Sequence, residues 1–263
     1  CIPAAAVEAL SGQQDSVAMM AAAFQARRDM VVDMLNAAPG MHCLKPEGAF
    51  YVYPAVHGCI GKTSAGGRKI IDDEAFVVAL LEEKRSALIS RVVTRGLDPN
   101  APLKPSGQEW LGEIPAHWEV KRVKYLFRLV ADPAPEDNAF ELLSLYTDIG
   151  VRPRKELEAR GNKSTTTDNY WMVQCGDLIV NKLLAWMGAF GVSDYDGVTS
   201  PAYDILRSTA DIEPYYYHHL FRCGICQPEI RRRSYGIMDM RLRLYFDRLG
   251  DMAVPVPPRE EQA

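Results

Sequence analysis

The hydrophobic pattern of the first 95 residues predicts two helices with a short strand between them. In "QQDSVAMMAAAFQARRDMVVDMLNAAPG", residues 13–40, apolar side chains recur at helical spacing until Pro39-Gly40 ends the run. The segment "EGAFYVYPAV", residues 47–56, alternates as a strand does. A second helix is predicted to begin at a capping Asp72 or Asp73 and to stop at Gly96, with an apolar stripe formed by Val77, Leu81, Leu88 and Val92.

Beyond Gly96 the pattern changes to short runs of Val, Ile, Leu and Tyr. Turn sequences such as "QCGD", "SDYDG" and "RSTAD" separate these runs, which predicts a set of short strands. The stretch "YYYHHLFRCGICQPEIRRR", residues 215–233, predicts a helix interrupted at Pro228, and "RLRLYFD", residues 241–247, predicts a closing strand. The fold class is therefore mixed α/β: a small α/β segment joined by a helix to a mixed α/β domain.

Composition is typical of a globular protein, and the 263 residues allow two small domains. No apolar run approaches the roughly 18 residues that cross a bilayer, so no membrane contact is predicted. The chain begins at Cys1 without a signal-peptide pattern, and its six cysteines are scattered. These features predict a cytoplasmic protein without a disulfide framework.

Charge is distributed unevenly along the chain. Residues 1–83 carry 6 Lys and Arg against 10 Asp and Glu, whereas residues 84–263 carry 24 of each. The segment from Arg222 to Arg248, however, contains seven arginines and only three acidic residues. Arginine suits phosphates and guanine edges because its fork donates two hydrogen bonds at fixed geometry. Charge alone does not decide between a phosphate-binding surface and a solvated helix end.

Two other motifs suggest chemistry that their spacing does not support. "GCIGKTS" lacks the glycine that a phosphate-binding loop needs five positions before Gly61, which favours an ordinary surface loop. Four potential zinc ligands lie within nine residues, with no second ligand pair nearby, so helix packing is favoured over a metal site; they are His218, His219, Cys223 and Cys226. No catalytic residue and no metal ligand is predicted.

One glycine-rich motif, "NKLLAWMGAFGVSDYDGVTSPAY", residues 181–203, is predicted to supply packing and turns. The predicted packing residues are Trp186, Phe190 and Tyr203, and the glycines expected to allow tight turns are Gly188, Gly191 and Gly197. The polar side chains expected to make external contacts here are Lys182 and Ser200.

Residues 1–83 resemble a piece of a class I, aspartate-type, pyridoxal-phosphate aminotransferase. The resemblance is carried by "AAAVEALSGQQD", "AAFQARRDMVVDMLNAAPGMHCLKPEGAFYVYP" and "IGKTSAGGRKIIDDEAFVVALLE". In that family these stretches follow the cofactor-binding lysine and precede the arginine that grips the substrate carboxylate. Neither residue can be assigned here, so the resemblance implies a catalytically incomplete fragment that binds no cofactor.

Residues 84–263 resemble the specificity subunit of a type I restriction-modification system. The matching stretches are "EKRSALISRVVTRGLDPNAPLKPSGQEWLGEIPAHWEVKRVKYLF", "GDLIVNKLLAWMGAFGVSDYDGVTSPAYDILR" and "RLRLYFDRLGDMAVPVPPREEQ". The resemblance implies four parts: a truncated aminotransferase fragment (1–83), a spacer-helix end and linker (84–107), a target recognition domain (108–258) and the start of a distal spacer helix (259–263). A crossover near Glu82 to Lys84 suggests a fused or rearranged gene.

The second resemblance implies sequence-specific binding of double-stranded DNA without catalysis. The implied partners are modification and restriction subunits and a second specificity half. The residues expected at the DNA are Lys182, Ser200, Arg231, Arg232, Arg233, Arg241 and Arg243. In this hypothesis the basic run at Arg231, Arg232 and Arg233 contacts phosphates, and Arg241 or Arg243 recognises a base. The alternatives are an incomplete aminotransferase and a non-functional fusion remnant.

Overall fold

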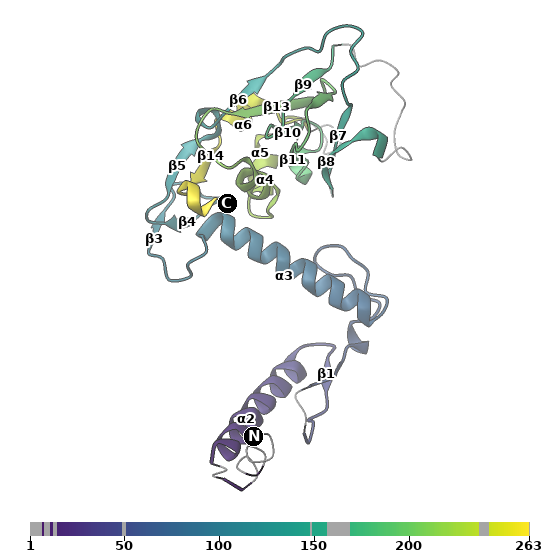
Figure 1. Ribbon diagram of the computed structural model, residues 1–263, viewed down its shortest axis with the longest axis vertical. Coiled ribbons are helices and arrows are strands. Elements are labelled where there is room, and N and C mark those ends of the chain that lie inside the picture. The colour runs from purple at the N-terminus through teal and green to yellow at the C-terminus, as the bar shows by residue number, and fades with distance from the viewer. Residues whose placement is uncertain are drawn as a thin grey trace. The chain divides into compact units, whose positions relative to one another are not determined.

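A computed structural model describes residues 7, 11–12, 15–48, 51–147, 149–156, 169–236 and 242–262. The chain divides into two compact units, Cys1–Arg85 and Ser86–Ala263, each of which is described by itself. Both contain helices and antiparallel strands, so the fold is mixed α/β, as the sequence predicts (Figure 1). Among the described residues, no helix combines the length and the apolar character that crossing a membrane requires.

The first unit is built on one long helix, α2 (Asp15–Ala37), which confirms the helix predicted there. A minimal sheet of β1 (His42–Cys43) and β2 (Pro54–Ala55) follows, with the short helix η1 (His57–Cys59) after it. The strand predicted over residues 47–56 is therefore wrong for most of its described length, because β1 offers only two residues to pair with. Residues 49–50 lie outside the described part.

Most apolar side chains of α2 are exposed, and Val32 is the buried residue of this helix. Met19, Phe24 and Met34 all face solvent. Side chains of this kind are normally covered by another layer of structure. The first unit thus leaves apolar surface open among its described residues.

Helix α3 (Asp73–Arg95) begins and ends where the sequence predicts. The Asp72 carboxylate caps its N-terminus by accepting a hydrogen bond from the backbone N–H of Ala75 at 2.7 Å. Gly96 ends it with φ +75°, a conformation that favours glycine. Of the predicted apolar stripe, Val77, Leu81 and Leu88 are exposed.

The second unit is organised around a four-stranded antiparallel sheet in the order β11-β10-β13-β6. Its strands are β6 (Phe127–Val130), β10 (Leu178–Asn181), β11 (Phe190–Val192) and β13 (Tyr203–Ser208). Two-stranded sheets surround it: β3 (Leu103–Pro105) with β4 (Glu113–Pro115), β5 (Glu119–Arg122) with β14 (Ala253–Val256), β7 (Leu143–Tyr146) with β8 (Gly150–Pro153), and β9 (Trp171–Val173) with β12 (Gly197–Thr199).

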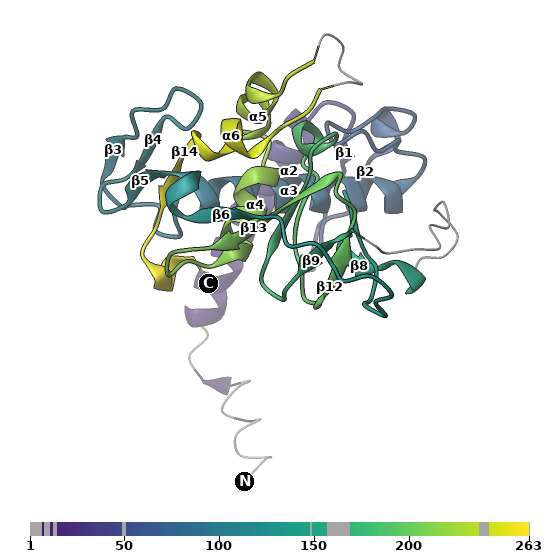
Figure 2. The same cartoon turned by 90° about the horizontal axis from the view of Figure 1, so that it is seen from above.

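Short α-helices and 3-10 helices also occur in the described part of the second unit. They are α4 (Pro214–Arg222), α5 (Gln227–Arg233), α6 (Phe246–Gly250), η2 (Val123–Tyr125), η4 (Ala185–Met187) and η6 (Arg259–Glu261). Helices α5 and α6 lie side by side (Figure 2).

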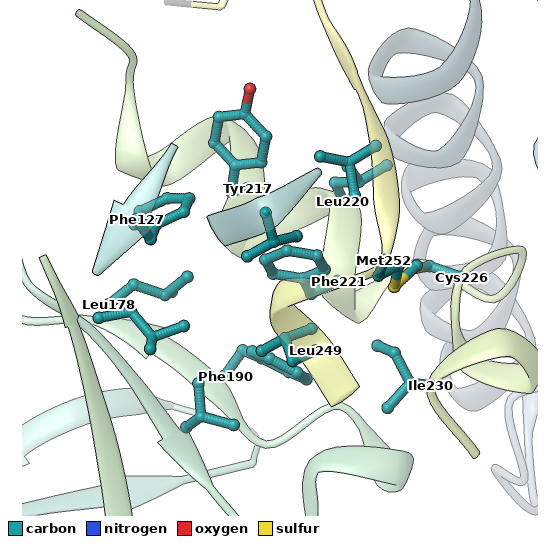
Figure 3. Packing of buried hydrophobic residues seen from close by; sticks show 14 of the residues in the cluster. Phe127, Leu178, Phe190, Tyr217, Leu220, Phe221, Cys226, Ile230, Leu249 and Met252 are labelled. Atoms are coloured by element: carbon teal, nitrogen blue, oxygen red, sulfur yellow. The ribbon is translucent and has the colours of Figure 1, made fainter. Parts of the chain in front are cut away.

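Strand β10 is buried on both faces, which is consistent with its apolar run Leu178–Val180. Leu178 and Val180 belong to a cluster that includes Tyr217 and Phe221 of α4 (Figure 3). Ile179 belongs to a second cluster, formed with residues of β7, β8 and β9. Successive strand residues therefore enter different clusters, as strand geometry requires.

The glycine-rich motif is confirmed in part. Gly188 ends η4 with φ +85° and allows a tight turn as predicted. Gly191 and Gly197 lie in strands, so the prediction that they allow turns is wrong. They permit close packing instead, since a Cβ on Gly197 would lie 2.4 Å from the backbone oxygen of Glu141.

Two further predictions are corrected around the arginine-rich segment. Pro228 does not interrupt a helix: the break spans Cys223 to Cys226, and the proline lies in the first turn of α5, where its missing N–H needs no partner. Residues 242–247 do not form a closing strand. Arg243 makes one isolated bridge with Tyr235, and α6 begins at Phe246.

Replacing Phe221 by alanine should lower the free energy of unfolding by about 3–5 kcal/mol, because Phe221 is fully buried against Phe190 at a ring distance of 5.0 Å. Urea unfolding followed by circular dichroism measures the change. Phe140→Ala is the control, since Phe140 is 43% exposed, and should cost less than about 1 kcal/mol. Equal losses in the two variants would contradict the assigned core.

Gly197→Ala should destabilise the second unit by about 1–3 kcal/mol, because the new methyl group would collide with backbone. The matched variant Gly224→Ala should be nearly neutral, since a Cβ there meets nothing within 4 Å. The thermal unfolding midpoints of the two variants test this difference. A Gly197→Ala protein as stable as Gly224→Ala would rule out the close approach of Gly197 to the backbone of Glu141.

Candidate nucleic-acid interface

The three arginines at the end of α5 do not share one environment. Glu229, in the first turn, has a side chain that is only 6% exposed, and its carboxylate serves two of them. Arg232 donates from Nε to Oε2 at 2.7 Å and from Nη2 to Oε1 at 2.8 Å. Arg233 donates from Nε to Oε1 at 2.6 Å. Part of the positive charge predicted for this run is therefore balanced within the helix.

Burial raises the pKa of the Glu229 carboxyl, but the hydrogen bonds from Arg232 and Arg233 outweigh burial and leave that pKa below its usual value. The carboxylate consequently stays ionised at neutral pH. It holds the two guanidinium groups at positions three and four residues further along the helix, where side chains share a face.

Arg231 points to a different neighbour. Its guanidinium lies over the ring of Trp186, 5.0 Å from the ring centroid, a cation–π contact between α5 and η4. Trp186 is half-buried and donates from Nε1 to the backbone oxygen of Leu183 at 3.1 Å. The packing role predicted for Trp186 is thus combined with support of an arginine.

Contacts continue from α5 to the segment around Arg248. Arg233 donates from Nη1 to the backbone oxygen of Arg248 at 3.2 Å, and the Arg248 guanidinium lies 4.7 Å from the ring centroid of Tyr235. Arg248 Nε also donates to the Tyr235 hydroxyl. Tyr235 in turn pairs with Arg243 through two backbone hydrogen bonds of 2.8 and 2.7 Å. This connected set links the segments that carry Arg231, Arg232, Arg243 and Arg248, and these four arginines are together called the arginine face below.

Arg243 has an exposed side chain, and no hydrogen bond of that side chain is recorded among the described residues. The strand predicted to hold it rigidly is absent, which removes the reason for preferring it as a base-recognising residue. Arg241 lies outside the described residues.

Lys182 and Ser200 are both engaged locally. The Lys182 ammonium donates to the backbone oxygen of Pro201 at 2.8 Å and lies 3.3 Å from the Asp204 carboxylate. Burial raises the pKa of Asp204, and Lys182 opposes that rise. The Ser200 hydroxyl accepts from the N–H of Ala202, within a turn. These contacts stabilise the start of β13, and the backbone oxygen of Lys182 also ties this region to Leu244 at 2.9 Å.

Large apolar side chains border the arginine face. They come from the η4 turn and from the segments that flank Arg243, and all are substantially exposed: Leu183, Leu184, Met187, Tyr235 and Tyr245. A surface that mixes arginine with tyrosine, methionine and leucine has the composition of a macromolecular interface more than that of a solvated helix end.

The His and Cys motif has a packing environment. Cys223 and Cys226 are buried, and burial raises the pKa of both thiols. Burial also lowers the pKa of His218 to about 3, so the ring is neutral at pH 7. Within the described part of the chain, no three His, Cys, Asp or Glu side chains are arranged to hold a metal ion.

Comparison with known proteins separates the two ends of the chain. Residues 1–95 match the family aminotransferase class I and II. Over 96 residues the chain is 62% identical to the aspartate/prephenate aminotransferase of Cereibacter sphaeroides and 51% identical to a probable aspartate/prephenate aminotransferase of Rhizobium leguminosarum. Each match covers 36% of this chain and 24% of the relative, so the chain spans about a quarter of the length of these relatives.

Three solved structures align with parts of the chain. The aspartate aminotransferase from Rhizobium meliloti is 45% identical, with a TM-score of 0.30, over 30% of this chain and 20% of that one. The HsdS subunit from Thermoanaerobacter tengcongensis aligns with 72% of this chain and 43% of its own, at 15% identity and a TM-score of 0.44. A chain from a type I R-M system aligns over 71% of this chain and 44% of its own length, at 16% identity and a TM-score of 0.38. Both resemblances predicted from the sequence recur in these comparisons.

Sequence reasoning missed the partners that organise the arginine face. Glu229 was visible three and four residues before Arg232 and Arg233, a spacing that favours helical ion pairs. The roles of Tyr235 and Arg248 had no local signal, because their contact depends on how α6 packs.

Glu229→Gln should lower the free energy of unfolding at pH 7 by about 1–2 kcal/mol, since it weakens charge-assisted hydrogen bonds. The pKa of Glu229 is lowered in the folded protein, so the contribution is complete above the carboxyl's unfolded pKa and is lost as pH falls through the folded value. Urea unfolding of both proteins at pH 7 and pH 3 measures the difference, which should shrink at the lower pH. A difference that is the same at both values would contradict the assigned ion pairs.

Proposed function

We propose that the second unit binds double-stranded DNA as one half of the specificity subunit of a type I restriction-modification system. In this proposal residues 108–258 form the recognition domain, and residues 84–107 belong to a spacer helix and linker. The unit performs no catalytic step. Together with a second specificity half, it directs the modification subunits that methylate DNA and the restriction subunits that cleave it.

The observation that carries the proposal is the arginine face. Arg231, Arg232, Arg243 and Arg248 lie on segments joined by direct contacts, in a unit that as a whole carries 22 Lys and Arg against 24 Asp and Glu. Concentrated positive charge is what phosphate contacts require, and it supplies most of the affinity in protein–DNA binding. The sequence resemblance of residues 84–263 to specificity subunits adds the expectation of sequence preference.

The first unit does not fit the cofactor of the aminotransferases that it resembles. Pyridoxal phosphate is held by a lysine that forms a Schiff base in an enclosed site. The lysines of this unit are all exposed, and they are Lys45, Lys62, Lys69 and Lys84. Lys45 is paired with Asp29 at 2.9 Å. We therefore assign no transamination step to these residues.

The full chain should bind a pool of randomised duplexes weakly, and the logarithm of its binding constant should fall with log salt by about 0.9 for each phosphate neutralised. Replacing both Arg231 and Arg243 by alanine should weaken binding to all sequences and flatten that slope. Arg68→Ala is the control, because Arg68 is an exposed arginine of the first unit. Fluorescence anisotropy at several salt concentrations measures both quantities.

Two outcomes would contradict the proposal. If the wild-type chain binds no duplex at low salt, the unit is not a DNA-binding module, and the hypothesis of a fusion remnant gains support. If the double variant binds with unchanged affinity and slope, DNA is bound elsewhere than on the arginine face.

A further inference from the structure

Arg232 has one edge of its guanidinium fixed and the other open. The edge formed by Nε and Nη2 bonds both oxygens of Glu229, at 2.7 and 2.8 Å. The terminal edge, formed by Nη1 with the second hydrogen of Nη2, has no recorded partner among the described residues. The side chain remains 70% exposed although one edge is bound. The open edge therefore faces solvent as a pair of N–H donors.

The carboxylate that fixes Arg232 is itself held in place. Glu229 is 6% exposed and is bound from a second direction by Arg233, whose side chain is 19% exposed and is anchored to the backbone oxygen of Arg248. An arginine normally loses rotamer entropy when a ligand fixes it. Here the fixed carboxylate restricts Arg232 before any ligand arrives, which is preorganisation.

The first unit contains the same pairing without the support. Arg68 donates from Nε and Nη2 to the two oxygens of Glu82 at 2.9 and 2.6 Å. Glu82, however, is 54% exposed, compared with 6% for Glu229. Exposed pairs of this kind are weak and mobile. The geometry of the pair is shared, and the buried carboxylate distinguishes Arg232.

We propose that Arg232, held by Glu229, recognises a guanine in the major groove, an inference that rests on the DNA binding proposed above. Two parallel N–H donors at fixed spacing match the O6 and N7 acceptors of guanine, and no other base presents that pair in the groove. A phosphate contact needs no such fixing, because phosphates are bound equally well by mobile side chains. The sequence predicts that Arg232 contacts phosphate, whereas this inference makes it a specificity-determining residue. Glu229 is then its positioning residue.

Selection from a pool of randomised duplexes tests the inference with the full chain. The wild type should select sequences that contain a guanine at one defined position, preferred there about tenfold or more over other bases. Arg232→Lys keeps the charge but removes the fork. It should lose the guanine preference while its salt slope stays unchanged.

Glu229→Gln separates positioning from general structural support. It removes one negative charge, so its affinity for unselected duplexes should stay equal or rise, whereas its guanine preference should fall. A merely structural role of Glu229 would lower both together. Arg68→Lys, the matched control, should leave consensus and affinity unchanged. Urea unfolding of each variant checks that it is folded.

The outcomes distinguish this inference from the proposed function. If the wild type binds no duplex, the proposed function fails. If the wild type binds duplexes but selects no consensus, or if Arg232→Lys selects the same consensus as the wild type, DNA binding stands and the role of Arg232 is wrong.

Discussion

The packing of α4 against the four-stranded sheet is the constraint on which the arginine face depends. Tyr217 meets Phe127 edge to face at a ring distance of 5.3 Å, and Phe221 meets Phe190 at 5.0 Å. These contacts fix where α4 ends. The turn between the buried residues Cys223 and Cys226 then sets the start of α5, and therefore the place where its arginines reach the surface. The polar surface is thus positioned by an apolar core.

The fold could be predicted from the sequence where an element depends on neighbouring residues. Prediction failed where an element depends on pairing with a distant strand. The cap at Asp72 and the stop at Gly96 depend on neighbouring backbone, so the limits of α3 followed from the sequence. In residues 242–245, buried Leu242 and Leu244 alternate with exposed Arg243, which is the pattern of a strand. The segment is extended but has a bridge only at Arg243, and no local pattern shows whether a partner strand exists.

The sequence predicted which residue types form the site, but not which partner each arginine contacts. A run of arginines within residues 84–263, whose net charge is zero, identified α5, because charge density is a property of sequence. Which guanidinium is neutralised, stacked or open depends on Glu229 and Trp186, which reach the arginines through burial and packing. Sequence reasoning treated Arg231, Arg232 and Arg233 as equivalent, whereas in the structure Arg231 lies over Trp186, and Arg232 and Arg233 share Glu229.

The position of the boundary between the two units explains how unrelated halves can share one chain. It lies within α3, between Arg85 and Ser86, and the residues around it, 84–88, are all exposed. Helical hydrogen bonds connect residues four apart, so a helix accepts a change of sequence wherever no side chain is needed for packing. The buried anchors lie on either side, Ala79 in the first unit and Val93 in the second. A junction between them leaves both sets of packing contacts intact.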